Sequence, residues 1–163
     1  MHHIVPIAEE HVAGFHACVD EVARERQYLA MLQAPPLEQS REFVRGQIRA
    51  NAPMFVALIG DSVAGWCDVI VKPRETLSHS GTLGMGVRAA HRGCGIGKAL
   101  METTLEGARN RGYKRVELTV RMDNERAKRL YERAGFIVEG LCRKHIFVDG
   151  RYYDSYLMAI LFE

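Results

Sequence analysis

The run Arg92-Gly93-Cys94-Gly95-Ile96-Gly97 lies between a strand-like segment and an amphipathic helical pattern, and it constrains the fold more than any other feature. Glycine allows left-handed backbone conformations and lets a ligand approach the main chain without a Cβ in the way. The first turn of the following helix leaves backbone N–H groups unpaired, and the helix dipole adds roughly half a positive charge there. The run therefore predicts a strand–turn–helix unit that binds an anion, with Arg92 and Lys98 adding positive charge.

Two common nucleotide-binding turns do not fit this run. A P-loop needs Gly-x-x-x-x-Gly-Lys-Ser/Thr, but Arg92 stands where the first glycine belongs and Ala99 where the hydroxyl belongs. A dinucleotide turn needs Gly-x-Gly-x-x-Gly, and here the third glycine, Gly97, comes one residue early. Glu117 has about the right separation for the acid of that motif, yet it lies in the middle of a predicted strand. On these residues alone, an anion site and a turn that merely reverses the chain both remain open.

The first half of the chain is predicted to form two helices followed by a β-hairpin. Apolar residues recur at helical spacing up to the break at Pro35-Pro36, and Gly60-Asp61-Ser62 is a turn between two apolar runs. His2 and His3, next to Met1, are left out of this interpretation. The expected elements are helices over residues 8–31 and Leu37–Ala50, strands over Met54–Ile59 and Val63–Val71, and a polar loop over Pro73–Gly81.

The second half alternates strands and helices more regularly. Gly112 and Gly135 end two helical patterns, Asn124 is a suitable N-cap, and Asp149-Gly150 is a strong hairpin signal. The expected elements are a strand Thr82–Arg88, a helix ending near Arg111, a strand through Val116, Leu118 and Val120, a short helix after Asn124, and strands Phe136–Val148 and Arg151–Leu161. This order predicts a mixed α/β fold in which helices cover a sheet.

Length and composition exclude several classes of protein. A chain of 163 residues without a low-complexity linker is expected to form one domain, residues 1–163. The formal net charge of +2 argues against a dedicated nucleic-acid binder, and no apolar run approaches the roughly 20 residues that span a bilayer. The four cysteines are scattered, so we expect reduced thiols in a cytoplasmic protein and no metal site.

Two blocks of residues together resemble the GNAT superfamily of N-acetyltransferases. Arg92, Gly95 and Gly97 fill the fixed places of its Arg/Gln-x-x-Gly-x-Gly/Ala signature. The second block consists of Asn124, Ala127, Leu130-Tyr131 and Gly135-Phe136, at a similar separation of one helix and one strand. The resemblance runs from about Met54 to the C-terminus. It implies a GNAT-like layered fold, with a mostly antiparallel central sheet splayed at the cofactor site and helices on both faces. Residues 1–52 would be a helical, substrate-side segment and 53–163 the sheet and acetyl-CoA-binding core.

The resemblance also implies an activity and a set of site residues. The activity is transfer of the acetyl group of acetyl-CoA directly to a primary amine, of a small molecule or an amino acid. A protein or peptide N-terminal acetyltransferase and a non-catalytic CoA-binding regulatory module remain alternatives. Tyr131 would protonate the departing thiolate, although its spacing alone fits a core aromatic, and Asn124 would contact the pantetheine arm as well as cap its helix. The cofactor-binding residues implied are Met85, Gly86, Val87, Arg92, Gly93, Cys94, Gly95, Ile96, Gly97, Lys98 and Asn124.

The base that deprotonates the amine is not identified by the sequence. Leu83 and Thr119 stand where members of the superfamily often carry a glutamate. The remaining candidates are Glu117, Asp68, Glu139, His145 and a chain of water molecules. Association as a homodimer is also left open, because the long terminal strands offer edges that need covering.

Overall fold

The structure is a computed structural model that describes all 163 residues. Seven strands form one sheet in the order β1-β2-β3-β4-β5-β7-β6, in which only the β4–β5 pair is parallel. The strands are β1 (His3–Pro6), β2 (Met54–Ile59), β3 (Ser62–Val71), β4 (Ser80–Val87), β5 (Arg115–Arg121), β6 (Ile137–Val148) and β7 (Arg151–Leu161). The helices are α1 (Val12–Arg24), α2 (Leu37–Arg49), α3 (Ile96–Asn110) and α4 (Glu125–Ala134).

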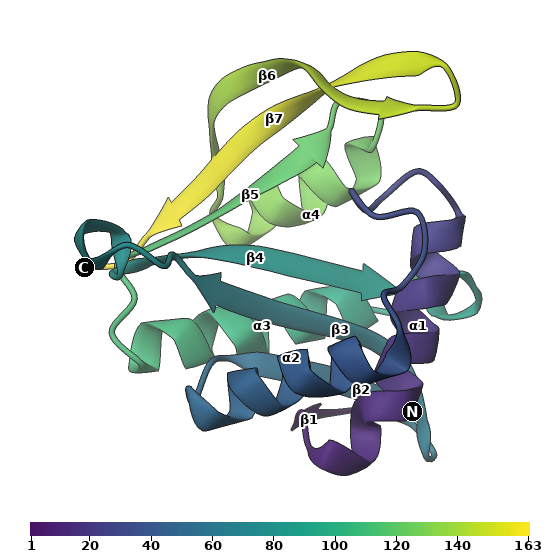
Figure 1. Cartoon of the computed structure of the whole chain (residues 1–163). Coiled ribbons are helices and arrows are strands. Elements are labelled where there is room, and N and C mark those ends of the chain that lie inside the picture. Colours follow the sequence, from purple (N-terminus) through teal and green to yellow (C-terminus); the bar gives the residue numbers. More distant parts are fainter.

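Helices cover both faces of the sheet (Figure 1). On one face, α3 and α4 pack through residues such as Leu100 and Tyr131 into a core of 17 buried residues. On the other face, α1 and α2 pack through Phe15 and Val44 onto β2 and β3, in a second core of 11 buried residues. The mixed, mostly antiparallel layered fold expected for the chain is therefore confirmed.

The sheet opens between its two middle strands. β4 pairs with β5 only where Ser80, Gly81 and Thr82 face Arg115, Val116 and Glu117. Beyond Thr82, β5 continues with β7 alone, while β4 continues with β3 as far as Val87. The backbone of β4 from Leu83 to Val87 therefore has no strand partner on its β5 side, which confirms the expected splay at Met85-Gly86-Val87.

The N-terminal segment differs from the prediction in two respects. His3–Pro6 forms β1, which pairs with β2, so residues 1–52 contain a strand as well as helices. The strand was missed because four residues at a sheet edge carry too little pattern to predict. The first helix ends at Arg24 instead of continuing to 31, and Arg26 adopts a left-handed conformation (φ 60°) that no α-helix contains.

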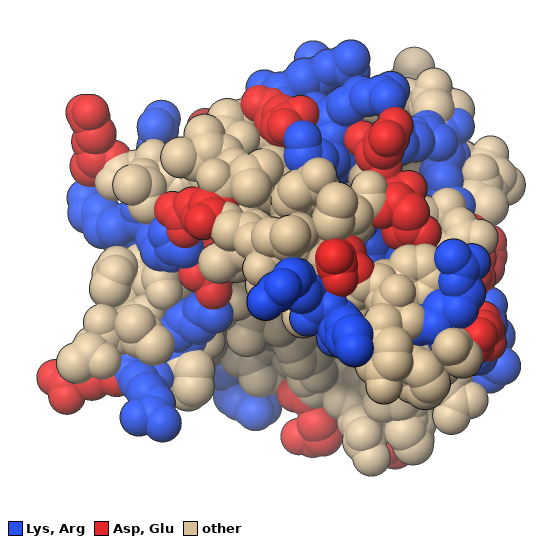
Figure 2. Space-filling model, turned by 90° about the horizontal axis from the view of Figure 1, so that it is seen from above, with Lys and Arg blue, Asp and Glu red and all other residues tan.

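Positive and negative side chains are interspersed on the face that includes the β6–β7 hairpin (Figure 2). Several of them are ion-paired, including Arg26 with Asp149 at 2.7 Å and Arg121 with Asp123 at 2.6 Å. No helix of the structure has the length and apolar character needed to cross a membrane.

Candidate active site

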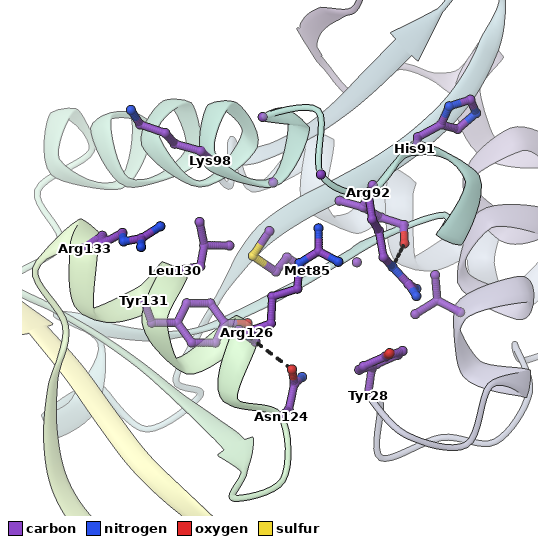
Figure 3. Close-up of a pocket in the computed structure, with 17 residues that line it drawn as sticks. Tyr28, Met85, His91, Arg92, Lys98, Asn124, Arg126, Leu130, Tyr131 and Arg133 are labelled. Atoms are coloured by element: carbon purple, nitrogen blue, oxygen red, sulfur yellow. Dashed lines mark hydrogen bonds between the residues drawn. The ribbon is translucent and has the colours of Figure 1, made fainter.

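A cavity of about 460 Å³ lies where the sheet opens, between the end of β4, the glycine turn and α4. Figure 3 shows Leu130 and Tyr131 of α4 on one side, Arg92 and Tyr28 on the other, and Met85 of β4 between them. The lining residues are Val22, Tyr28, Met85, Gly86, Val87, His91, Arg92, Gly93, Gly95, Gly97, Lys98, Asn124, Arg126, Ala127, Leu130, Tyr131 and Arg133. The structure thus brings together both sequence blocks that were predicted to share a site.

The glycine turn has the conformation expected of an anion-binding helix start. Gly93 and Gly95 have φ angles of 80° and 83°, a left-handed region that side chains with a Cβ rarely adopt. Gly95 is the N-cap of α3 and offers no side-chain hydrogen bond to the first turn. The first-turn N–H groups, which have no intrahelical partner, are therefore left for a ligand.

Arg92 is paired with a carboxylate of the loop after α1. Its guanidinium donates two hydrogen bonds to the Glu25 carboxylate, at 2.9 and 2.6 Å, and its Nε donates to the Val87 carbonyl at 2.9 Å. It also lies over the ring of Tyr28, 4.7 Å from the centroid. The Glu25 carboxylate raises the pKa of Arg92 and neutralises its charge. Arg92 lines the cavity as expected, but its pairing with Glu25 offsets the positive charge that the sequence analysis assigned to it.

Positive charge reaches the cavity from α4 instead. Arg126, Leu130 and Arg133 follow one another at helical steps of four and three, and all three line the cavity. A guanidinium nitrogen of Arg126 lies 3.5 Å from the position of a Cβ on Gly93, so this arginine stands directly beside the turn. Neither arginine was predicted as a site residue, because charges on a short polar helix usually indicate a solvated face.

Tyr131 is at once a core residue and a cavity residue. Its side chain is 9% exposed and packs edge-to-face with Phe136, with 5.8 Å between ring centroids. Burial raises the pKa of its phenol, so the hydroxyl keeps its proton well above neutral pH. Tyr131 is therefore a core aromatic residue that also borders the cavity.

Asn124 caps α4, as predicted. Its Oδ1 accepts a hydrogen bond from the Ala127 N–H at 3.2 Å, which is one of the dashed lines in Figure 3. The residue also lines the cavity. The cap leaves the side-chain NH₂ free of any partner within the protein, so the amide can still donate to a ligand.

Two of the predicted cofactor residues do not line the cavity. Ile96 is 2% exposed and belongs to the core beneath α3. Cys94 is exposed, and its thiol lies 3.7 Å from the Arg92 carbonyl oxygen of its own turn. Only the backbone of these two residues is placed to take part in the site.

The candidate bases differ sharply in their surroundings. Glu117 is paired with Lys72 and Arg115, and Glu139 with Arg115, so that hydrogen bonds from these cations lower the pKa of both carboxyl groups. His145 shares a 3.0 Å hydrogen bond with the Ser155 hydroxyl on the β6–β7 hairpin. Asp68 alone is both buried and free of any cation.

The cavity suits a long ligand with phosphate groups at one end. The unpaired edge of β4 offers backbone groups to amides, and the left-handed turn with its open helix start and nearby arginines offers donors to phosphates. No group of three or more His, Cys, Asp or Glu side chains is arranged to hold a metal ion. The open strand edge beside such a turn defines the class of protein with a site for an elongated anionic ligand.

Comparisons with known proteins agree with this class. The model of the acetyltransferase (GNAT) family matches residues 8–136. The chain is 32% identical over 138 residues to the L-amino acid N-acetyltransferase AaaT of Escherichia coli (strain K12), an alignment that covers 84% of this chain and 85% of that protein. The chain therefore belongs to the GNAT family of acetyltransferases.

Solved structures show the same fold at low sequence identity. A GNAT-family acetyltransferase from Streptococcus pneumoniae superposes with a TM-score of 0.93 at 24% identity, covering 99% of this chain and 100% of that one. The yncA protein of Salmonella typhimurium, solved with its cofactor acetyl-CoA, superposes with a TM-score of 0.95 at 16% identity, covering 100% and 95%. Family and fold together confirm the expectation of an acetyl-CoA-dependent N-acetyltransferase.

Proposed function

We propose that the chain transfers the acetyl group of acetyl-CoA directly to the primary amine of a small molecule or an amino acid. The observation that carries this proposal is the anchoring of the loop from Glu25 to Pro36, which spans the substrate side of the opening. Glu25 binds Arg92 of the glycine turn, and Arg26 binds Asp149 of the β6–β7 hairpin at 2.7 Å. Arg121 of β5 donates to the Arg26 carbonyl at 3.2 Å. We expect these contacts to hold the loop across the approach to the site, which would favour a small acceptor over a polypeptide end.

The name of the E. coli relative, an L-amino acid N-acetyltransferase, supports the same acceptor class. A protein or peptide N-terminal acetyltransferase is the second candidate. A polypeptide acceptor would need the Arg26–Asp149 bridge to open, and Thr119 stands where such enzymes often carry an acid. A CoA-binding module without catalysis is disfavoured by the retained Tyr131, which has no binding task of its own.

We propose that backbone groups make most of the contacts to acetyl-CoA. The edge of Met85, Gly86 and Val87 would pair with the pantetheine amides, and the N–H groups of residues 93–98 would surround the pyrophosphate. Arg126 and Arg133 would add the charge that Arg92 does not supply, and the Asn124 amide would hydrogen-bond the pantetheine arm. When bound, acetyl-CoA supplies the thioester carbon with which the amine forms its new C–N bond while the C–S bond breaks.

Tyr131 would give its proton to the sulfur as the thiolate leaves. A phenol whose pKa is raised by burial is fully protonated at neutral pH, so it is always available as the donor. The amine must also lose a proton before it attacks, either to a second side chain or to water.

Assembly and location complete the proposal. Ile137, Phe147 and Leu161 on the terminal strands are each 62–65% exposed, and burying such side chains would favour association as a homodimer. The four free cysteines support a cytoplasmic location, and the chain would act as one domain of residues 1–163.

The test compares small amines with peptides. Thiol release from acetyl-CoA would be followed with the common amino acids and simple amines, and in parallel with peptides carrying free N-termini. The proposal expects turnover with at least one small amine at a kcat/KM at least tenfold above that of any peptide. Turnover with peptides alone would replace it by the second candidate, and binding of acetyl-CoA without any turnover by the third.

A further inference from the structure

Asp68 is an isolated carboxyl group inside the protein. It is 4% exposed, its Oδ1 has no hydrogen-bond partner, and no ion pair includes it. The Gly84 N–H is the only group that favours its charged form. Burying a carboxylate without a cation is costly, and this side chain neither caps a helix nor forms an ion pair. A buried, unpartnered polar atom of this kind needs a reason that lies in the protein's activity.

Two glycines on β4 leave room for the side chains of the neighbouring strand β3. Asp68 of β3 lies opposite Gly84 of β4, and Trp66 lies opposite Gly86. Oδ1 is 3.3 Å from the position of a Cβ on Gly84, and a Cβ on Gly86 would clash with the Trp66 ring. Because Gly84 has no side chain, the Asp68 carboxyl group lies directly against the backbone of β4 at this position.

The far edge of β4, away from β3, is the open one. From Leu83 onward β4 has no partner on its β5 side, and Met85 and Gly86 line the cavity there. Neighbouring strands lie about 4.8 Å apart, so a carboxyl group over Gly84 stands within one strand spacing of the edge where the acyl group would bind. One water molecule bridges such a distance readily.

No other charged group near Asp68 is unpaired and available to accept a proton. On the β2 side it faces Met54, and on the β4 side Gly84. On the same sheet face, Lys72 and Arg115 are both paired with Glu117. On the helices that cover this face, Asp20 is paired with Arg24, Glu21 with Arg88, and Arg41 and Arg45 with Glu9. Burial raises the pKa of Asp68 to about 7, and the Gly84 N–H opposes this only in part. A group that titrates near neutrality is well matched to accepting and releasing a proton.

Asp68 and Gly84 themselves do not line the cavity, so an amine in the cavity would reach the carboxyl group through water. We propose that Asp68 takes the proton from the acceptor amine through one water molecule. The proposal rests on the function proposed above. Two protons leave the amine nitrogen in each turnover. The first passes from the ammonium to the Asp68 carboxylate before attack and goes to solvent afterwards. The second leaves when the C–N bond has formed and replaces, through solvent, the proton that Tyr131 gives to sulfur. The net products are the amide, the free thiol and one proton.

The first test is the pH dependence of kcat/KM for the amine in wild type, Asp68→Asn and Glu117→Gln. We expect Asp68→Asn to lower the rate at pH 7 at least 100-fold, to leave the KM for acetyl-CoA within threefold, and to lose the inflection near pH 7. Its deficit should shrink above pH 9, where the amine loses its own proton. A wild-type profile in Asp68→Asn, or loss of the inflection in Glu117→Gln instead, would overturn the assignment and leave the proposed function intact. A wild type inactive on every amine would overturn both.

The second test needs no turnover. The infrared band of a protonated buried carboxyl should be present in wild type, absent in Asp68→Asn, and titrate near pH 7. Adding CoA and the acceptor amine together forms a non-reacting complex, in which an ammonium beside Asp68 should lower that midpoint by at least one pH unit. An unchanged midpoint would mean that no ammonium approaches Asp68 and would overturn the proposal. If Asp68→Asn does not fold, Asp68→Ala with formate replaces it. Recovery of activity with formate supports the assignment, and none in a folded protein contradicts it.

Discussion

Arg92 and Glu25 form a bidentate ion pair that joins the glycine turn to the loop after α1, although the two residues are 67 positions apart in the sequence. Both side chains are largely shielded, at 20% and 27% exposure, so this pair is screened less than the surface pairs elsewhere on the molecule. The contact links the part of the chain proposed to hold acetyl-CoA to the part proposed to border the amine.

Removing the Glu25 carboxylate should therefore affect the acceptor more than the co-substrate. We expect Glu25→Gln to raise the KM for the amine about five- to twentyfold, because the loop loses its anchor at the turn, an effect of roughly 1–2 kcal/mol. Steady-state kinetics at saturating acetyl-CoA would measure it. The matched control is Glu21→Gln. It breaks the ion pair between Glu21 of α1 and Arg88, but it leaves the Arg92–Glu25 pair that anchors the loop after α1. Equal effects of the two variants would show that the loop anchor has no special role.

Tyr131→Phe separates the hydroxyl of this residue from its packing. The ring would keep its contact with Phe136, so the protein should remain folded with a stability change within about 1 kcal/mol. Turnover should fall more than tenfold, while calorimetry should find near-normal affinity for acetyl-CoA. A rate equal to that of wild type would remove the proton-donor role.

Gly95→Ala tests the conformation of the glycine turn. A Cβ at Gly95 would meet no atom within 4 Å, so its cost comes from the left-handed φ of 83° alone, about 1–2 kcal/mol. Gly60→Ala is the matched control, because Gly60 also has a left-handed φ, of 59°, and open space, in a turn remote from the cavity. Both variants should lose similar stability in urea titrations, but only Gly95→Ala should weaken acetyl-CoA binding, by at least tenfold. Equal affinities would contradict the proposed role of the turn.

Asp68 should also make the free energy of unfolding depend on pH. Its pKa is raised to about 7 in the folded protein, against about 3.9 in an unfolded chain, so the folded state keeps a proton that the unfolded state loses between these values. The contribution is fully present below pH 4 and is lost as pH rises through 7. Relative to Asp68→Asn, wild type should therefore lose up to about 4 kcal/mol of unfolding free energy between pH 4 and pH 8. A difference that is independent of pH would show that Asp68 is not a raised-pKa carboxyl.

The sequence predicts the second half of the fold well because its signals are local. Helix α3 and helix α4 have strong apolar periodicity, and each is followed by a left-handed glycine, Gly112 or Gly135. The secondary structure of the first 36 residues was harder to predict. The helix expected over residues 8–31 ends at Arg24, and the apolar side chains of Tyr28 and Met31 lie in an exposed loop instead.

The two sequence motifs predicted that the glycine turn, the end of β4 and the start of α4 lie around one cavity. They did not predict which side chains pair with one another there. The pairing of Arg92 with Glu25 depends on where the loop after α1 packs, which no local pattern encodes. Arg126 and Arg133 belong to the site only because α4 packs beside the turn. The isolation of Asp68 depends on Gly84 in a neighbouring strand and on the helices that cover its face of the sheet.

The most direct test of the central claim is product stoichiometry. The purified protein would be given acetyl-CoA and one small amine at a time, with free thiol followed by absorbance and the acetylated amine by mass spectrometry. We predict that at least one amine yields thiol and N-acetyl product in a 1:1 ratio, and that Tyr131→Phe slows both equally. Thiol released without any acetylated amine, or no thiol with any amine tested, would contradict it.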